Sequence, residues 1–208
     1  MAAYTFYTNP MSRGQIARWA LHEVSADYEQ MLVDWAAKPA AFVAANPMGK
    51  VPTIIHHSAA GDRVVTECAA ICAYLAQVTP EAGLLPADAE LADYYRWMFF
   101  AAGPVEQAIV GRSMGWEVPE GREGMVGFGS FERVLDTLDG HFSANDYACG
   151  ARFTMADVYV GSQIDWGLTF GSIPPRESLV AYAQRLQARA AYIAAKAIDA
   201  QLIQEAQK

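Results

Sequence analysis

Hydrophobic positions in the first eighty residues alternate between strand-like and helix-like spacing. Side chains recur every three or four positions in two stretches, which predicts helices at 16–24 and 71–78. Three other stretches are rich in β-branched and aromatic residues, and a fourth alternates hydrophobic and polar positions, which predicts strands at 3–7, 28–33, 51–55 and 63–66. The last two strands flank Gly61-Asp62, a dipeptide typical of hairpin turns. In this order the segments predict a small α/β layer domain.

From Asp88 onward the pattern is helical. Hydrophobic stripes at helical spacing occupy residues 91–102, 128–142 and 179–186. The intervening stretch, Thr79–Pro86, contains two prolines and a glycine and suits a linker. We therefore expect an α/β domain at 1–79, a linker at 80–87 and an all-helical domain at 88–208.

Composition narrows the class of protein. The chain has 208 residues, of which 53% are hydrophobic and 18% charged, so it can bury a sizeable core and is not disordered. No apolar run approaches the roughly 20 residues that a membrane span needs. The N-terminus lacks the basic start and apolar stretch of a secretory signal, and three cysteines are too few for a disulfide scaffold. A cytoplasmic protein is expected.

The charge of the chain limits the kinds of partner that it can bind. Acidic residues outnumber basic ones by 23 to 15, which gives a net charge of −8, and no run of five Lys or Arg occurs. Nucleic acids and acidic membrane surfaces are bound by basic patches, so neither is expected as a partner. A small molecule or another protein remains.

One candidate site lies in Asn9–Gly14, between the first strand and the first helix. Ligands bind at such junctions in α/β sheets, and the free N–H groups of a helix N-terminus favour an anion. Ser12 would lie beside those groups. It can take part in chemistry there, or it can simply cap the helix, as serine commonly does.

Two further segments at the ends of predicted strands are candidates for ligand binding. A cis Val51-Pro52 bond would leave the Val51 N–H and C=O free for a peptide-like ligand, whereas a trans proline would only open an edge strand. Glu67 and Cys68 fall at the first turn of the next helix. Glu67 can bind a ligand's ammonium group, or it can merely complement the helix dipole.

Together these motifs resemble the thioredoxin-like half of cytosolic glutathione transferases. The residues are Pro10-x-Ser12, then Asn-Pro-x-Gly-Lys-Val-Pro at 46–52, then Glu67-Cys68. A capping box formed by Thr154 and Asp157 resembles one in the family's helical domain. The resemblance spans about residues 3–200. It implies a thioredoxin-like βαβαββα domain followed by an all-helical domain, and a bacterial-type protein with a serine-type site.

The resemblance implies that the protein is a glutathione transferase with a role in detoxification. Such enzymes bind glutathione as co-substrate and lower the pKa of its thiol, and the thiolate attacks a small hydrophobic electrophile. Ser12 matches the serine that hydrogen-bonds the thiolate, with Tyr7 and Asn9 as competitors for that role. Other glutathione-dependent enzymes on this scaffold (a peroxidase, isomerase or dehalogenase) and a non-catalytic binding module stay open. A homodimer is also implied.

Residue by residue, the resemblance assigns a binding role to six further positions. Val51 would pair with the cysteinyl unit beside a cis peptide to Pro52, and Glu67 would hold the γ-glutamyl end together with the N–H of Cys68. Lys50 would contact the peptide or its glycyl carboxylate. Lys38 can reach the same carboxylate or remain a solvated surface lysine. The family usually has serine where this chain has Cys68, and a thiol is a weaker hydrogen-bond donor.

The resemblance makes Met11, Met114 and Trp116 candidates for the electrophile site, although each can instead be a packing residue. Cys68 and Cys72 lie four residues apart on a helix, a spacing that fits either a redox or metal site or two small buried side chains. No histidine or cysteine nearby completes a metal site, so we expect no metal.

Overall fold

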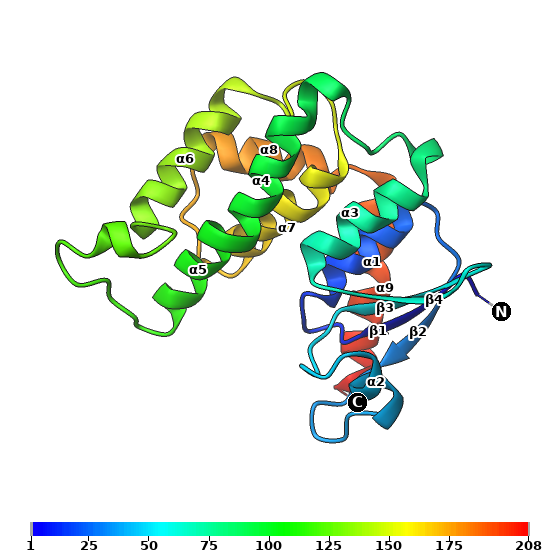
Figure 1. Ribbon diagram of the computed structural model, residues 1–208. Coiled ribbons are helices and arrows are strands. Elements are labelled where there is room, and N and C mark those ends of the chain that lie inside the picture. Colours follow the sequence, from blue (N-terminus) through cyan, green and yellow to red (C-terminus); the bar gives the residue numbers. More distant parts are fainter. Residues whose placement is uncertain (1, 208) are drawn as a thin grey trace. The chain divides into compact units, whose positions relative to one another are not determined.

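A four-stranded mixed sheet organises the first part of the chain, seen in blue and cyan in Figure 1. The computed structural model describes residues 2–207. The strands are β1 (Tyr4–Thr8), β2 (Tyr28–Leu32), β3 (Thr53–Ser58) and β4 (Gly61–Thr66), in the order β2-β1-β3-β4. β1 is parallel to β2 and antiparallel to β3, and β4 is antiparallel to β3. The β-α-β start and the hairpin are confirmed, but Gly61 opens β4 instead of forming the turn.

Helices cover both faces of this sheet. They are α1 (Gly14–Glu23), α2 (Ala40–Ala45) and α3 (Cys68–Val78), followed by a 3₁₀ turn at Pro80–Ala82. Phe6 of β1 lies under the guanidinium of Arg18 from α1, 5.3 Å from its ring centre. Its neighbour Tyr7 points to the other face and packs on Phe42 of α2, with ring centres 5.2 Å apart. Strand alternation thus places α1 and α2 on opposite faces, and α3 packs beside α1.

The last helix, α9 (Ala190–Ala206), also belongs to this first unit. By their contacts the residues divide into one unit made of Met1–Gly83 with Ala188–Lys208, and another made of Leu84–Gln187. α9 packs along α1. The sequence pattern, which assigns everything after residue 88 to one helical domain, does not distinguish the final twenty residues from the helices before them.

A buried ion pair fixes α9 to α1. Arg18 is fully buried, and its Nε donates to Oδ1 of Asp199 at 3.0 Å. Its Nη1 donates to the Tyr28 hydroxyl and to Oε1 of Gln30, each at 3.0 Å. Burial raises the pKa of Asp199, and the charge of Arg18 opposes that rise. Because a charge left unpaired in such a place is costly, each partner requires the other.

The second unit is built from helices joined by loops. Its elements are a 3₁₀ turn (Asp88–Glu90), α4 (Leu91–Phe100), a π-helical turn (Ala101–Val105), α5 (Glu106–Ser113), a 3₁₀ turn (Glu123–Met125), α6 (Phe131–Ala144), α7 (Met155–Thr169) and α8 (Glu177–Gln187). α7 is buried over most of its length and packs against α4 and α8. Among the described residues, no helix has the length and hydropathy to cross a membrane. The predicted thioredoxin-like domain followed by a helical domain is confirmed.

The capping box at the start of α7 is formed. The buried carboxylate of Asp157 accepts from the backbone N–H of Thr154 at 2.8 Å and of Ala148 at 2.6 Å, and from the Tyr182 hydroxyl at 2.9 Å. Burial raises the pKa of Asp157 to about 6, while these donors act in the opposite direction. One carboxylate therefore joins the start of α7, the loop before it and α8.

This raised pKa gives a stability prediction with a definite sign. The pKa of Asp157 is near 4 in the unfolded chain and about 6 in the folded chain. Between these two pH values the folded chain keeps a proton that the unfolded chain has lost. That contribution to stability is present below pH 4 and is lost as pH rises through 6. Relative to Asp157→Asn, wild type should lose about 2 kcal/mol of unfolding free energy between pH 4.5 and 7.5. Urea unfolding of both proteins at several pH values measures this difference. If wild type instead gains stability relative to Asp157→Asn as pH rises, the donors outweigh burial, and an unchanged difference would mean that the two effects cancel.

Candidate functional site

The three junctions singled out in the sequence meet at one edge of the sheet. Tyr7 pairs with Thr53, and Thr53 pairs with Thr66. The end of β1, the start of β3 and the end of β4 are therefore neighbours, and the segments just beyond them share that edge. The Cys68 thiol also donates to the Arg13 carbonyl, with sulfur and oxygen 3.5 Å apart. This contact joins the start of α3 to the loop before α1.

Ser12 is half-buried in that loop, at the start of α1. Its hydroxyl donates to the Asn9 carbonyl at 2.6 Å and accepts from the Gly14 N–H at 3.0 Å. The hydroxyl therefore does satisfy a free N–H at the helix start, as the capping interpretation expects. It has a single O–H, so donating to a ligand requires giving up the bond to Asn9.

Asn9 and Gly14 shape the same loop. The Asn9 side chain donates to the Val33 carbonyl at 3.1 Å and accepts from the Met11 N–H at 2.9 Å, so its amide is used within the protein. A Cβ on Gly14 would overlap Oγ1 of Thr8 and lie 3.1 Å from Oγ of Ser12. Only glycine lets α1 start this close to the end of β1. Nothing in the sequence pattern distinguishes Gly14 from the other residues of this loop.

The Val51-Pro52 peptide bond is cis, as the family resemblance implies. Among the residues that the structure describes, the Val51 N–H and C=O have no hydrogen-bond partner. The preceding carbonyl, of Lys50, accepts from Nδ2 of Asn46 at 2.9 Å and from the Thr53 hydroxyl at 3.1 Å. Asn46 is buried and holds this loop in shape. Its role was missed, although its place in the Asn-Pro-x-Gly turn motif is a usable signal.

Two lysines lie at this loop. Lys50 is exposed beside Val51. The ammonium of Lys38 reaches over Gly49, since a Cβ built there would lie 3.1 Å from it. Gly49 itself has φ 59°, a conformation that favours glycine. The structure thus brings Lys38 and Lys50 to the same loop.

Glu67 precedes α3 with φ 64° and ψ 121°. A non-glycine residue in this region is strained by about 1–3 kcal/mol, and such strain often marks ligand-binding positions. The side chain is exposed, and its carboxylate makes no hydrogen bond or ion pair within residues 2–207. It lies at the N-terminus of α3, next to the cis-proline loop.

Cys68 and Cys72 are both buried, free thiols on α3. Burial raises the pKa of Cys72 well above its usual value, so this thiol stays protonated at neutral pH. Across the described part of the chain, no group of three or more His, Cys, Asp or Glu side chains is arranged to hold a metal.

Tyr7, the competitor to Ser12, is a core residue. Only 6% of it is exposed, and it packs with Val33 and Phe42 between the sheet and α2, against the partly buried Val51 and Ile55. This packing is the ordinary structural role of a strand tyrosine. Which residue faces a bound sulfur stays a prediction.

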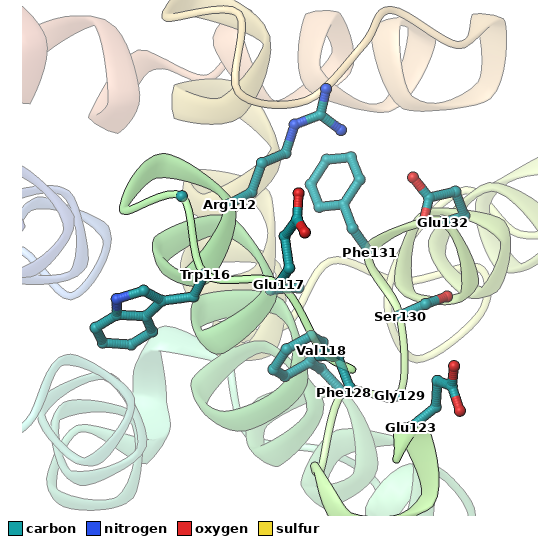
Figure 2. A pocket seen from close by; sticks show the side chains of 12 residues that line it. Arg112, Trp116, Glu117, Val118, Glu123, Phe128, Gly129, Ser130, Phe131 and Glu132 are labelled. Atoms are coloured by element: carbon teal, nitrogen blue, oxygen red, sulfur yellow. The ribbon is translucent and has the colours of Figure 1, made fainter. Parts of the chain in front are cut away.

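The residues expected to contact the electrophile are divided between the two units. Met11 is 73% exposed and belongs to the Ser12 loop. Met114 and Trp116 are exposed after α5, in the second unit. Trp116 lines a cavity of about 590 Å³ between the end of α5 and the start of α6. Figure 2 shows its wall, where the Arg112 guanidinium stacks over the Phe131 ring at 4.3 Å.

Comparison with known proteins identifies the chain. Residues 2–77 match the family described as the glutathione S-transferase N-terminal domain, and residues 87–166 match the corresponding C-terminal domain. The chain belongs to the glutathione S-transferase family. The family prediction made from the motifs is confirmed, and with it the prediction of a transferase enzyme. The comparisons do not favour the other functions left open.

Similar proteins extend over most of this transferase. It is 29% identical over 171 residues to "Glutathione S-transferase 3" of Zea mays, covering 76% of this chain and 75% of the maize protein. A glutathione transferase structure from Methylococcus capsulatus has 27% identity and a TM-score of 0.77, covering 95% of this chain and 99% of that one. A sphingomonad glutathione S-transferase complexed with glutathione has 26% identity and a TM-score of 0.75, covering 94% and 98%.

Substitution of glycine by alanine should have opposite effects on stability at a crowded glycine at the start of α1 and at an open glycine in α6. Gly14→Ala should destabilise this transferase by about 1–3 kcal/mol, because its Cβ would overlap Thr8. Gly140→Ala, inside α6 where a Cβ meets nothing within 4 Å, should stabilise by about 1 kcal/mol. Urea unfolding measures both. Equal effects of the two substitutions would contradict the close approach at Gly14.

Proposed function

We propose that this transferase binds glutathione at the sheet edge described above and stabilises its thiol as thiolate for attack on small hydrophobic electrophiles. The observation that carries the proposal is the meeting of Ser12, the cis Val51-Pro52 bond and Glu67 at that edge. Each group suits a different part of one tripeptide, and their spacing along the edge follows from strand pairing.

Glutathione offers a complementary group for each position. Its γ-glutamyl ammonium can pair with the unpartnered Glu67 carboxylate, and its γ-glutamyl carboxylate can accept from N–H groups at the α3 N-terminus. Its cysteinyl N–H and C=O can pair with those of Val51, as an added strand pairs with a sheet edge. The glycyl carboxylate then extends toward Lys38 and Lys50, whose ammonium groups carry the opposite charge.

Ser12 would stabilise the thiolate by exchanging one hydrogen bond for another. When sulfur approaches, the hydroxyl releases the Asn9 carbonyl and donates to sulfur, while it continues to accept from the Gly14 N–H. A hydrogen bond to the charged form and the N-terminus of α1 both lower the thiol pKa. Because a free thiol has a pKa near 8.5, a lowering of about two units makes thiolate the main form at neutral pH.

The reaction itself needs few protein groups. The thiol proton passes to solvent, and the sulfur lone pair forms a bond to an electrophilic carbon. A leaving group departs with the electron pair of its bond. The exposed Met11 side chain, in the Ser12 loop, gives the apolar part of such a substrate a surface to contact. Met114 and Trp116 stay candidates for the same substrate.

The thiolate role of Ser12 can be tested spectroscopically. Ultraviolet difference absorbance of bound glutathione against pH reports the thiolate directly. Its midpoint should lie below that of free glutathione and should rise by about one unit or more in Ser12→Ala, because a hydrogen bond to the thiolate is lost. Ser58→Ala, which removes a hydroxyl at the opposite end of β3, serves as the control. An unchanged midpoint in Ser12→Ala would transfer the role to another group, and Tyr7→Phe would then be measured.

We also propose that the protein is a cytoplasmic homodimer. On α4, Leu91, Tyr95 and Phe99 recur every four residues and are 43%, 52% and 71% exposed. The opposite side of α4 carries Tyr94 and Trp97, which are buried. A helix with an apolar stripe left exposed after its other side is buried suits an interface between two copies.

The dimer proposal predicts that one charge on α4 separates the subunits. Phe99→Glu places a carboxylate at the most exposed position of the apolar stripe and should convert the protein to monomers at micromolar concentration. Light scattering measures the mass of both proteins, with Glu132→Gln on α6 as a surface control. Wild type that is already monomeric, or a Phe99→Glu variant that stays dimeric, would contradict an interface at this stripe.

A further inference from the structure

α9 and α1 are joined by a row of side-chain contacts that runs along both helices in opposite directions. At one end Arg189 makes two hydrogen bonds to Glu23, each 2.7 Å long. One turn further, the rings of Tyr192 and Trp19 meet edge to face with centres 5.1 Å apart. Another turn further, near the N-terminus of α1, Lys196 Nζ donates to Oε1 of Gln15 at 2.7 Å.

The Lys196 contact continues into the loop that carries Ser12. Nε2 of Gln15 donates to the Pro10 carbonyl at 2.6 Å. Pro10 lies between Asn9, whose carbonyl accepts from the Ser12 hydroxyl, and Met11. A continuous path of hydrogen bonds thus leads from the C-terminal helix to the loop, through a single glutamine.

The lysine determines which way the Gln15 amide points. An amide has an oxygen that accepts and a nitrogen that donates, whereas an ammonium group can only donate. With Lys196 donating to the oxygen, the nitrogen is left to donate to the Pro10 carbonyl, which can only accept. Without the ammonium group, the amide can rotate, and Pro10 loses a defined partner.

We propose that Lys196 is a positioning residue that holds the Asn9–Gly14 loop in place through Gln15. Asp199 lies one turn along α9 from Lys196; it is paired with Arg18, and the charges of Lys196 and Arg18 both oppose the rise that burial causes in its pKa. The Tyr192 ring lies 5.3 Å from the ammonium group, so the lysine stem is packed as well as bonded. As a consequence, the C-terminal helix contributes to the geometry of the loop that carries Ser12, which lies within the first fourteen residues.

The loop itself can be measured without any ligand. The Met11 N–H is bonded to Asn9, and the Gly14 N–H to Ser12, so their hydrogen exchange reports how well the loop is held. In Lys196→Met, which keeps the aliphatic stem, both amides should exchange about tenfold faster, the ratio expected when a hydrogen bond with a charged partner is lost. Lys196→Arg keeps a donor and should restore most of the protection.

The matched control is Arg189→Met, at the other end of the same row. It also removes a cation from the α9–α1 interface, but it lies far along α1 from the loop. We expect it to leave the Met11 and Gly14 amides unchanged. If Lys196→Met leaves them unchanged, or if Arg189→Met accelerates them as much, Lys196 does not position the loop.

The consequence for chemistry rests on the proposed thiolate function and has a separate readout. In the glutathione complex, Lys196→Met should raise the thiol midpoint by about half a unit, because Ser12 is held less well, and Arg189→Met should not. A wild-type complex without thiolate near neutral pH would overturn the proposed function, whereas the exchange rates would still decide the role of Lys196. Faster loop exchange with an unchanged thiol midpoint would overturn the link from this loop to the sulfur.

Discussion

The candidate site depends on the pairing register of three strands. Tyr7 opposite Thr53 and Thr53 opposite Thr66 put three chain junctions at one sheet edge, although more than forty residues separate the first two along the chain. A shift of one residue in either pairing would turn every side chain of that strand to the other face. Phe6 and Tyr7, which bury opposite sides of β1 under α1 and α2, make that shift unfavourable. The packing of the core therefore determines where the polar groups meet.

A second constraint comes from the far end of the chain. Arg18 lies in the middle of α1 and is fully buried, so it needs a carboxylate that its own segment does not supply. Asp199 supplies it from α9, 181 residues away. A buried charge is stable only when its partner is present, so Arg18 requires α9 to pack on α1. The sequence pattern of the first domain does not show that this helix belongs to it. The same helix surface carries Lys196 to the start of α1.

The sequence predicts the four strands of the first domain, α1, α3 and the three junctions, because turn residues and hydrophobic spacing mark them locally; the short α2 has no such mark. It does not mark α9, since an alanine-rich helix with few large side chains shows no clear hydrophobic stripe. The hairpin turn lies at Ala59-Ala60, before the predicted Gly61-Asp62, because Gly61 fits a turn and a strand end equally well in isolation. Asn46 and Gln15 are common polar residues whose importance comes only from the carbonyls that the fold places beside them. Their roles therefore depend on tertiary structure.

Which polar groups of the site already have hydrogen-bond partners determines how a ligand can bind there. Asn9 and Asn46 use their amides to hold two loops, so both loops are already shaped before any ligand arrives. In the described chain, the Val51 backbone and the Glu67 carboxylate lack partners and can bind without breaking an internal hydrogen bond. Ser12 differs, because its only proton is bonded to Asn9. A neutral thiol is a weak acceptor and competes poorly with a carbonyl for that proton, whereas a thiolate competes well. The exchange at Ser12 would therefore favour the ionised form of the ligand over the neutral one, which is the discrimination that activation of a thiol requires.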